Sequence, residues 1–292
     1  MDGILIINKP KNYTSNDIVN KVKKALNTKV GHTGTLDPNA TGVLPLLLGK
    51  GTKFSKYLIN HDKKYIATLQ LGIKTSTADV EGDVIEEKEV DTSVLESKNI
   101  NNVLKSFIGK QVQTPPIYSA IKVKGKKLYE YARNNIDVEI PKRNIEIYSI
   151  NLIDMNPEKN ELKFEVECSK GTYIRSLCED IAENLNTVGY MKELQRAKAG
   201  EFEISQSITM EELSENKNNI DWLNKKIITL EDLLKNTDKI IIKSCDFDKF
   251  LNGVKLTTNN KDGLYAIYTE DNKFIGSGIV ENKKVKRDVI LY

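Results

Sequence analysis

The chain has 292 residues, of which 39% are hydrophobic and 29% charged, a composition typical of soluble globular proteins. This length predicts one large domain plus a small one. No apolar run approaches the roughly 18 residues of a membrane helix, and the N-terminus lacks the basic region of a signal peptide. Three cysteines without metal or redox spacing and only two histidines predict reduced thiols, a cytoplasmic location and no metal site.

The net charge of +3 is unevenly distributed. Residues 1–60 carry nine lysines and three aspartates, a net of +6, so the remainder carries −3. Further basic clusters occur at 122–127 and 283–287. Such local excess favours a phosphate-binding surface, although lysines also serve simply to keep a surface soluble.

Hydrophobic periodicity predicts the elements of the first part of the chain. Ile4–Ile7 is a short apolar strand, and Thr14 begins a group of N-cap candidates ahead of a helix. Residues 31–51 hold five glycines and two prolines, which predicts tight turns leading into an apolar strand at Val43–Leu48. Tyr65–Leu71 alternates like a half-buried strand.

The second part of the chain predicts a helix over 102–108, a lysine-rich hairpin around Gly125 and a helix over 128–133. Residues 161–186 predict a strand, a turn and an amphipathic helix, and 211–226 are helical. A boundary near residue 238 precedes a β-rich tail. Its turns are expected at 252–253, 262–263 and 276–278, which predicts a small barrel-like domain.

One segment partly resembles a phosphate-binding P-loop, but its spacing does not match. Gly49-Lys50-Gly51-Thr52 resembles the end of a P-loop, but that motif requires four residues between its glycines and Ser or Thr directly after the lysine. Six residues separate Gly42 from Gly49, and Gly51 follows the lysine. A nucleoside triphosphatase is therefore rejected.

The segment from Gly31 to Pro45 is the densest in chemical groups. It places a histidine, three threonines and one carboxylate, Asp37, among three glycines. Glycines permit sharp turns and close approach to a ligand, and Pro38 stiffens the chain directly after Asp37. A rigid loop presenting one carboxylate suits nucleophilic or acid–base chemistry. By composition alone, a simple Asp-Pro turn is the more frequent outcome.

Two further side chains could complete such a site. Arg175 stands at the start of the helix expected after Gly171, and an arginine near a lone carboxylate would keep it ionised and oriented. Tyr65 follows two lysines, an arrangement that can stack a base while the lysines meet phosphate. The alternatives are a solvated arginine and an aromatic residue packed into the core, and the residues alone name no reaction.

At these residues the chain resembles the TruB family, the bacterial tRNA pseudouridine-55 synthases. The signature loop spans Gly31–Pro45, and Asn8-Lys9-Pro10 matches the family's first motif. Lys64-Tyr65 with Leu71-Gly72, Thr75 and Asp79 matches the second, and Phe107–Arg133 matches the insertion that grips the RNA. Gly171–Leu177 matches the motif with the active-site arginine, and Leu194-Gln195-Arg196 resembles a later motif. Gln195 departs from the basic residue frequent there, which would weaken a phosphate contact.

The resemblance implies an α+β fold. The expected catalytic domain, residues 1–237, is built on a mixed, mainly antiparallel sheet flanked by helices and loops, with the RNA-gripping insertion at about 107–140. Residues 238–292 resemble the small, β-rich, PUA-like RNA-binding domain that many members carry.

The resemblance also implies roles for seven residues. Asp37 would be the catalytic carboxylate, and Arg175 would pair with it. Five others would bind the substrate: Tyr65 stacks on the uracil, Tyr173 and Leu194 line its pocket, His32 holds displaced nucleotides, and Lys9 supports the loop or contacts the backbone.

The implied reaction isomerises uridine-55 of the tRNA T-arm to pseudouridine, and it needs no cofactor or metal. The base must first leave its stack. The expected protein is a monomer that requires no membrane or protein partner. Two alternatives stay open: an RNA-binding or tRNA-folding protein in which modification is secondary, and a guide-RNA-dependent relative.

Overall fold

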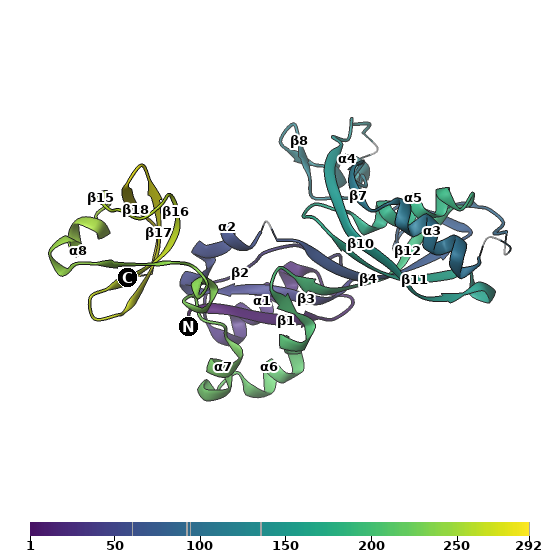
Figure 1. Cartoon of the computed structure of the whole chain (residues 1–292). Coiled ribbons are helices and arrows are strands. Elements are labelled where there is room, and N and C mark those ends of the chain that lie inside the picture. Colours follow the sequence, from purple (N-terminus) through teal and green to yellow (C-terminus); the bar gives the residue numbers. More distant parts are fainter. Residues whose placement is uncertain (60, 92, 94, 135, 292) are drawn as a thin grey trace.

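The computed structural model describes residues 1–59, 61–91, 93, 95–134 and 136–291. A nine-stranded sheet forms its larger part (Figure 1), with seven strands in the order β1-β3-β12-β4-β11-β10-β7. The other two, β2 and β13, pair with β3 and β12. The nine strands are β1 (Gly3–Lys9), β2 (Val30–His32), β3 (Thr41–Leu48), β4 (Lys63–Leu71), β7 (Gly109–Gln113), β10 (Arg143–Asn156), β11 (Glu161–Cys168), β12 (Gly189–Ala199) and β13 (Phe202–Glu203).

The sheet is mixed and mainly antiparallel, as the family resemblance implies. Its one parallel pairing joins β12 to β3 at Gln195↔Thr41 and Arg196↔Gly42. Two ribbons lie outside the sheet. They are β5 (Ile73–Thr75) with β6 (Val84–Glu87), and β8 (Lys122–Val123) with β9 (Lys126–Lys127).

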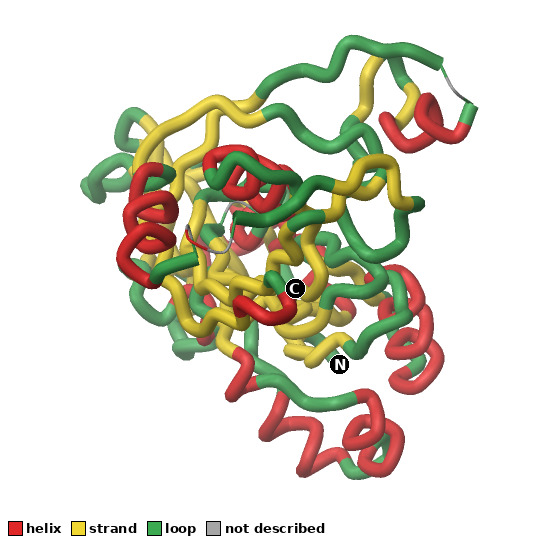
Figure 2. Tube along the Cα trace, turned by 90° about the vertical axis from the view of Figure 1, so that its right-hand side faces the viewer, coloured by secondary structure: helices red, strands yellow, loops and turns green. Residues whose placement is uncertain are grey.

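Helices cover the sheet. Successive residues of a strand point to opposite faces, so both faces present apolar side chains that need covering. Leu5 and Ile7 of β1 join the larger core, whereas Ile4 and Ile6 join a smaller core on the other face. In Figure 2 the strands occupy the interior and most helices lie at the periphery. The helices of this part are α1 (Ser15–Leu26), α2 (Ser55–Leu58), α3 (Ser97–Ser106), α4 (Leu128–Arg133), α5 (Ile174–Asn184), α6 (Met210–Asn216) and α7 (Ile220–Lys226), with 3-10 turns η1 (Gly49–Phe54), η3 (Pro157–Lys159), η4 (Ile204–Gln206) and η5 (Asp232–Leu234).

The C-terminal part is a small curled β unit. Its five strands run in the order β14-β16-β17-β18-β15, and they appear in yellow-green at one end of the molecule in Figure 1. The elements are β14 (Lys239–Ile242), α8 (Ser244–Leu251), β15 (Leu256–Thr257), β16 (Gly263–Thr269), β17 (Phe274–Glu281) and β18 (Lys284–Ile290).

One prediction for this unit is wrong. The glycines at 276–278 lie inside β17, not in a turn. A Cβ at Gly276 would meet the Val289 carbonyl oxygen at 2.0 Å, so the glycine is required because β18 passes close by. Helix α8 was not expected from the sequence.

The small unit packs tightly on the large one. A shared apolar cluster includes Phe54 and Leu230 from one side and Tyr268 and Val289 from the other. The Tyr268 hydroxyl also donates to Glu231 at 2.8 Å. The two parts therefore meet through a packed core.

Most predicted elements of the large part are confirmed. The strands at Ile4–Ile7, Val43–Leu48 and Tyr65–Leu71 lie inside β1, β3 and β4. The helix expected at 102–108 begins earlier, at Ser97. The α+β fold class is confirmed, whereas β10 and β12 were missed. Among the described residues, no helix is both long and apolar enough to cross a membrane.

Candidate active site

Asp37 lies in the loop between β2 and β3, and hydrogen bonds to the backbone carbonyls of this loop hold it in place. The five consecutive carbonyls of residues 34–38 all accept hydrogen bonds. Arg196 donates to the carbonyls of residues 34 and 35, and the Ser15 hydroxyl donates to that of residue 36. The Ala40 amide donates to the carbonyl of residue 37, and the Asn12 amide and the Lys9 amine both donate to that of residue 38. The Ala40-to-Asp37 bond, at 3.1 Å, closes a turn with Pro38 at its second position, where proline is favoured. Asp37 therefore stands in an Asp-Pro turn that also presents a carboxylate.

Two fully buried cations support this loop. The Lys9 amine donates to the carbonyls of Tyr13 at 2.6 Å and of Pro10 and Pro38 at 2.9 Å. Arg196 Nε donates to the Val43 carbonyl at 2.7 Å. Lys9 is 0% exposed and Arg196 1%. Because buried charges are costly without partners, these contacts fix the loop firmly against β1 and β12.

Arg175 is shared between two carboxylates. Its Nε lies 3.2 Å from Asp37 Oδ2, and its Nη1 lies 3.3 Å from Asp79 Oδ2. The guanidinium also donates to the carbonyls of Thr77 at 3.2 Å and Tyr118 at 3.0 Å. Since the Arg175 side chain is only 7% exposed, its direction toward Asp37 is set by several partners at once.

The start of α5 is anchored to the last residue of β7 and to the residue that follows it. The Gln113 side chain accepts from the Tyr173 amide at 2.8 Å and donates to the Tyr173 carbonyl at 3.0 Å. The Ser176 hydroxyl donates to the Thr114 carbonyl at 2.9 Å. These bonds place Tyr173 and Arg175 at a defined point beside the Asp37 loop.

A cavity of about 960 Å³ joins these segments, within the size range of small-molecule sites. Five of the seven site residues predicted from the sequence line it: Asp37, Tyr65, Tyr173, Arg175 and Leu194. They come from the β2–β3 loop, β4, the turn before α5, α5 itself and β12. Residues 118–120, Tyr129 and Arg133 also line it.

The structure places the other two predicted residues outside the cavity lining. Lys9 is buried beneath the loop and has its amine turned to backbone carbonyls. His32 ends β2 and pairs with Leu46. The Nδ1 atom of His32 is buried without a hydrogen-bond partner.

Burial governs the electrostatics of the site. It raises the pKa of Asp37, Asp79 raises it further, and Arg175 opposes both effects. The side chain of Asp37 is 36% exposed, and we attribute this exposure to the open cavity that it lines. Burial also raises the pKa of Tyr65, against the opposing effect of the Arg196 guanidinium. Burial lowers the pKa of Lys9 to about 8 and, together with Arg196, lowers that of His32.

Two residues of the site received no role from the sequence. Asp79 was noted only within a motif, yet it is 7% exposed and pairs with Nη1 of Arg175, whereas Asp37 pairs with Nε. Arg196 is buried behind the loop. A signal for Arg196 was available, because it follows Leu194 by two residues on a strand and shares its inward direction.

The arrangement can orient an ionised carboxylate beside an aromatic ring in a partly closed cavity. Asp37 is held by Arg175, and Tyr65 and Leu194 are buried at its side. A planar base can stack on Tyr65 while Asp37 acts on it. The cavity wall carries Lys63, Lys170 and three arginines, Arg133, Arg143 and Arg196, besides Arg175. This favours a polyanionic substrate.

Two family models match the chain in succession. The model of the TruB family pseudouridylate synthase N-terminal domain matches residues 21–174, and that of the tRNA pseudouridylate synthase B C-terminal domain matches residues 175–241. The chain therefore belongs to the TruB family of pseudouridylate synthases.

Individual relatives agree over nearly the whole chain. The chain is 46% identical to a tRNA pseudouridine synthase B of Clostridium kluyveri, over 98% of each protein. It is 44% identical to that of Alkaliphilus oremlandii, over 97% of this chain and 94% of the relative. Among solved structures, the crystal structure of a Cbf5-Nop10-Gar1 complex matches with a TM-score of 0.72 at 26% identity, covering 99% of this chain and 85% of the other. An H/ACA RNP bound to a substrate RNA containing 2′-deoxyuridine matches with a TM-score of 0.70 at 25% identity, covering 99% and 85%.

Proposed function

We propose that this chain isomerises uridine-55 in the T-loop of tRNA to pseudouridine, with Asp37 as the catalytic carboxylate. The observation that carries the proposal is the meeting of Asp37, Arg175 and Tyr65 in one cavity whose lining includes five further lysine and arginine side chains. The relatives named tRNA pseudouridine synthase B support tRNA as the substrate.

The reaction breaks the bond from uracil N1 to ribose C1′ and joins C1′ to uracil C5 instead. C5 loses its proton and N1 gains one, so the product is an isomer of the substrate. The uridine must first be flipped out of its stack. In the proposed complex Tyr65 stacks on the uracil, and Tyr173 and Leu194 enclose it. Asp37 acts on the flipped nucleotide, and the bound nucleotide fills the cavity and keeps water from the detached sugar.

The remaining predicted residues have supporting roles in this proposal. Lys9 holds the Asp37 turn from beneath through the Pro38 carbonyl. His32 precedes the cavity-lining Thr33 in the chain, and we assign it to the displaced nucleotides. The unit from residue 238 to 292 is assigned to RNA binding, and residues 1–237 to catalysis.

The two solved structures keep a partner-dependent alternative open, because both are multicomponent complexes and one is an RNP. We propose that this chain acts as a monomer without guide RNA or protein partner. The test is to incubate the purified chain with an isolated T-arm stem-loop and to map pseudouridine by chemical modification and sequencing. Conversion at the position equivalent to 55 supports the proposal. Conversion only after addition of a guide RNA or partner would favour the alternative.

A control stem-loop with cytidine at the target position tests the specificity of the assignment. It should bind but yield no product. Conversion of a neighbouring uridine in that control would contradict the assignment to a single position. A chain that folds the RNA but forms no pseudouridine in either stem-loop would favour the tRNA-folding alternative.

A further inference from the structure

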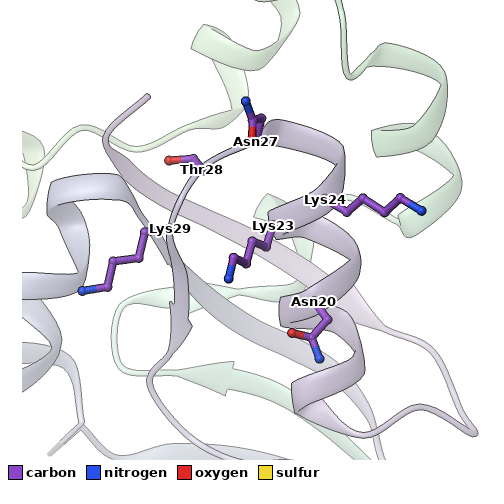
Figure 3. Close-up of a pocket in the computed structure, with 6 residues that line it drawn as sticks. All are labelled: Asn20, Lys23, Lys24, Asn27, Thr28 and Lys29. Atoms are coloured by element: carbon purple, nitrogen blue, oxygen red, sulfur yellow. The ribbon is translucent and has the colours of Figure 1, made fainter.

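A second hollow lies away from the reaction cavity, at the end of α1. Its volume is about 370 Å³, and it is lined by Asn20, Lys23, Lys24, Asn27, Thr28 and Lys29. In Figure 3, Lys23 and Lys29 extend toward the same side of the hollow, whereas Lys24 extends away on the other side of the helix. None of its lining residues is acidic.

The lysines of this hollow differ from the other lysines of residues 1–60 in their contacts. Of the nine lysines in residues 1–60, six contact other groups. Lys9 donates to carbonyls, Lys11 pairs with Glu193, Lys21 lies over the Tyr13 ring, Lys50 and Lys53 donate to the carbonyls of Leu291 and Ile290, and Lys56 pairs with Asp288. Within the described ranges, the remaining three, Lys23, Lys24 and Lys29, form no ion pair. Within the described ranges, the lysines of residues 1–60 whose side chains contact no other group are thus gathered at one place.

Helix electrostatics explain only part of this cluster. Lys23 and Lys24 stand in the last turn of α1, where cations offset the negative end of the helix dipole. Lys29 lies beyond the helix, directly before β2, and the dipole gives no reason for it. A surface that serves only solubility usually intersperses both signs of charge, and this hollow does not.

The hollow lies close to the reaction cavity along the chain. Lys29 directly precedes β2, and Thr33, which directly follows β2, lines the cavity that contains Asp37. At about 3.3 Å per residue, these two positions are no more than about 13 Å apart. One strand of a DNA duplex carries a phosphate about every 3.4 Å of its axis, and on that scale the gap spans only a few phosphates.

We infer that this hollow binds the phosphodiester backbone of the stem that flanks the nucleotide in the reaction cavity. The inference rests on the proposed function, since it takes the substrate to be RNA. Lysine, asparagine and threonine are side chains that contact phosphate oxygens. The hollow has no aromatic lining residue on which a base could stack. It therefore contributes affinity and orientation without reading sequence.

The test is a double variant, Lys23→Gln with Lys29→Gln, in the full chain. The matched control is Lys98→Gln with Lys105→Gln, which removes the same charge from exposed positions on α3, at the other end of the large part (Figure 1). Binding of tRNA is measured by filter retention at several salt concentrations. Circular dichroism verifies that both variants fold.

We expect the hollow variant to bind tRNA several-fold more weakly. The slope of log Kd against log salt should fall by about two, because each lysine that meets a phosphate contributes about one. The loss should appear in KM. The α3 control should retain the slope of the unmodified chain. An unchanged Kd and slope in the hollow variant overturns the inference.

The same assays separate this inference from the proposed function. If the unmodified chain binds tRNA but forms no pseudouridine, the proposed function fails, and a reduced salt slope in the hollow variant still supports the hollow. If the unmodified chain forms pseudouridine and the hollow variant binds like it, only the inference about the hollow fails.

Discussion

The Arg175 guanidinium lies between Asp37 and Asp79, 3.2 Å from one carboxylate and 3.3 Å from the other. A lysine has one compact charge and cannot reproduce this planar, two-sided geometry. The relationship makes Arg175 the element that connects the two acidic segments of the site, the β2–β3 loop and the segment after β5.

Arg175→Lys should therefore reduce product formation far more than it reduces tRNA binding. We expect a fall of about 100-fold in the single-turnover rate, equivalent to about 2.7 kcal/mol of activation free energy. Rapid-quench assays at saturating tRNA measure the rate, and filter binding measures Kd. A rate within a few-fold of the parent chain would show that the shared geometry is not required.

The pH dependence follows from the raised pKa of Asp37. If the ionised form acts, activity falls on acidification, and the midpoint should lie above the ordinary value of about 4. Asp79→Asn removes a neighbouring negative charge that raises this pKa, so the acid limb should move to lower pH. Single-turnover rates between about pH 4.5 and pH 8 test this prediction, because burial moves the pKa of a carboxyl group upward. A limb that stays in place would contradict the assigned coupling.

The raised pKa of Asp37 changes stability with pH in the direction opposite to its effect on activity. A carboxyl group whose pKa is raised on folding stabilises the fold in its protonated form. That contribution is lost as pH rises from the unfolded pKa through the folded one. Ionised Asp37 is therefore maintained at a cost in stability, which is common at catalytic sites.

Gly42 tests the packing of the loop on β12. Its φ is +102°, and a Cβ would lie 2.3 Å from the Arg196 carbonyl oxygen. Gly42→Ala should lower the free energy of unfolding by about 3 kcal/mol and slow the reaction by displacing the Asp37 loop. Urea unfolding measures the first effect. Gly31→Ala is the matched control, since its Cβ would meet only Thr52 Cγ2, at 3.8 Å. Equal stability of the two variants would contradict the packing argument.

Lys9 tests the support beneath the Asp37 turn. Lys9→Met keeps the length of the side chain but leaves the carbonyls of Pro10, Tyr13 and Pro38 without the amine. The expected loss is about 3 kcal/mol in the free energy of unfolding, since buried acceptors would lose charged donors. Lys11→Met, at an exposed pair with Glu193, should cost less than about 1 kcal/mol. The account of the loop would be wrong if both variants unfolded at the same urea concentration.

Local sequence predicted the loop that carries Asp37 better than it predicted the sheet around it, whereas the roles of the site residues came from the family resemblance. Glycine, proline and threonine between Gly31 and Pro45 identify the loop because turn chemistry is encoded within a few residues. Strand β4 was recognised because its apolar residues alternate. In β10 and β12, charged residues and register shifts interrupt that alternation, so their pairing depends on neighbours distant in the chain.

The contacts that hold Asp37 were the hardest part to predict. Arg196 reaches the loop only because β12 pairs with β3 in parallel at Arg196↔Gly42, about 150 residues away along the chain. Lysine and arginine usually lie at the surface, yet Lys9 and Arg196 are both buried. The pairing of strands distant in sequence decides whether these cations are buried, and the spacing of residues within a motif does not reveal that pairing.

The most direct test of the central claim is pseudouridine formation by Asp37→Asn, which preserves the size of the side chain and removes its charge. Purified parent and variant are each incubated with tRNA, and nuclease digests are analysed by mass spectrometry after labelling of pseudouridine. The account predicts that the variant binds tRNA like the parent and forms no pseudouridine. Conversion by Asp37→Asn at the rate of the parent would contradict it.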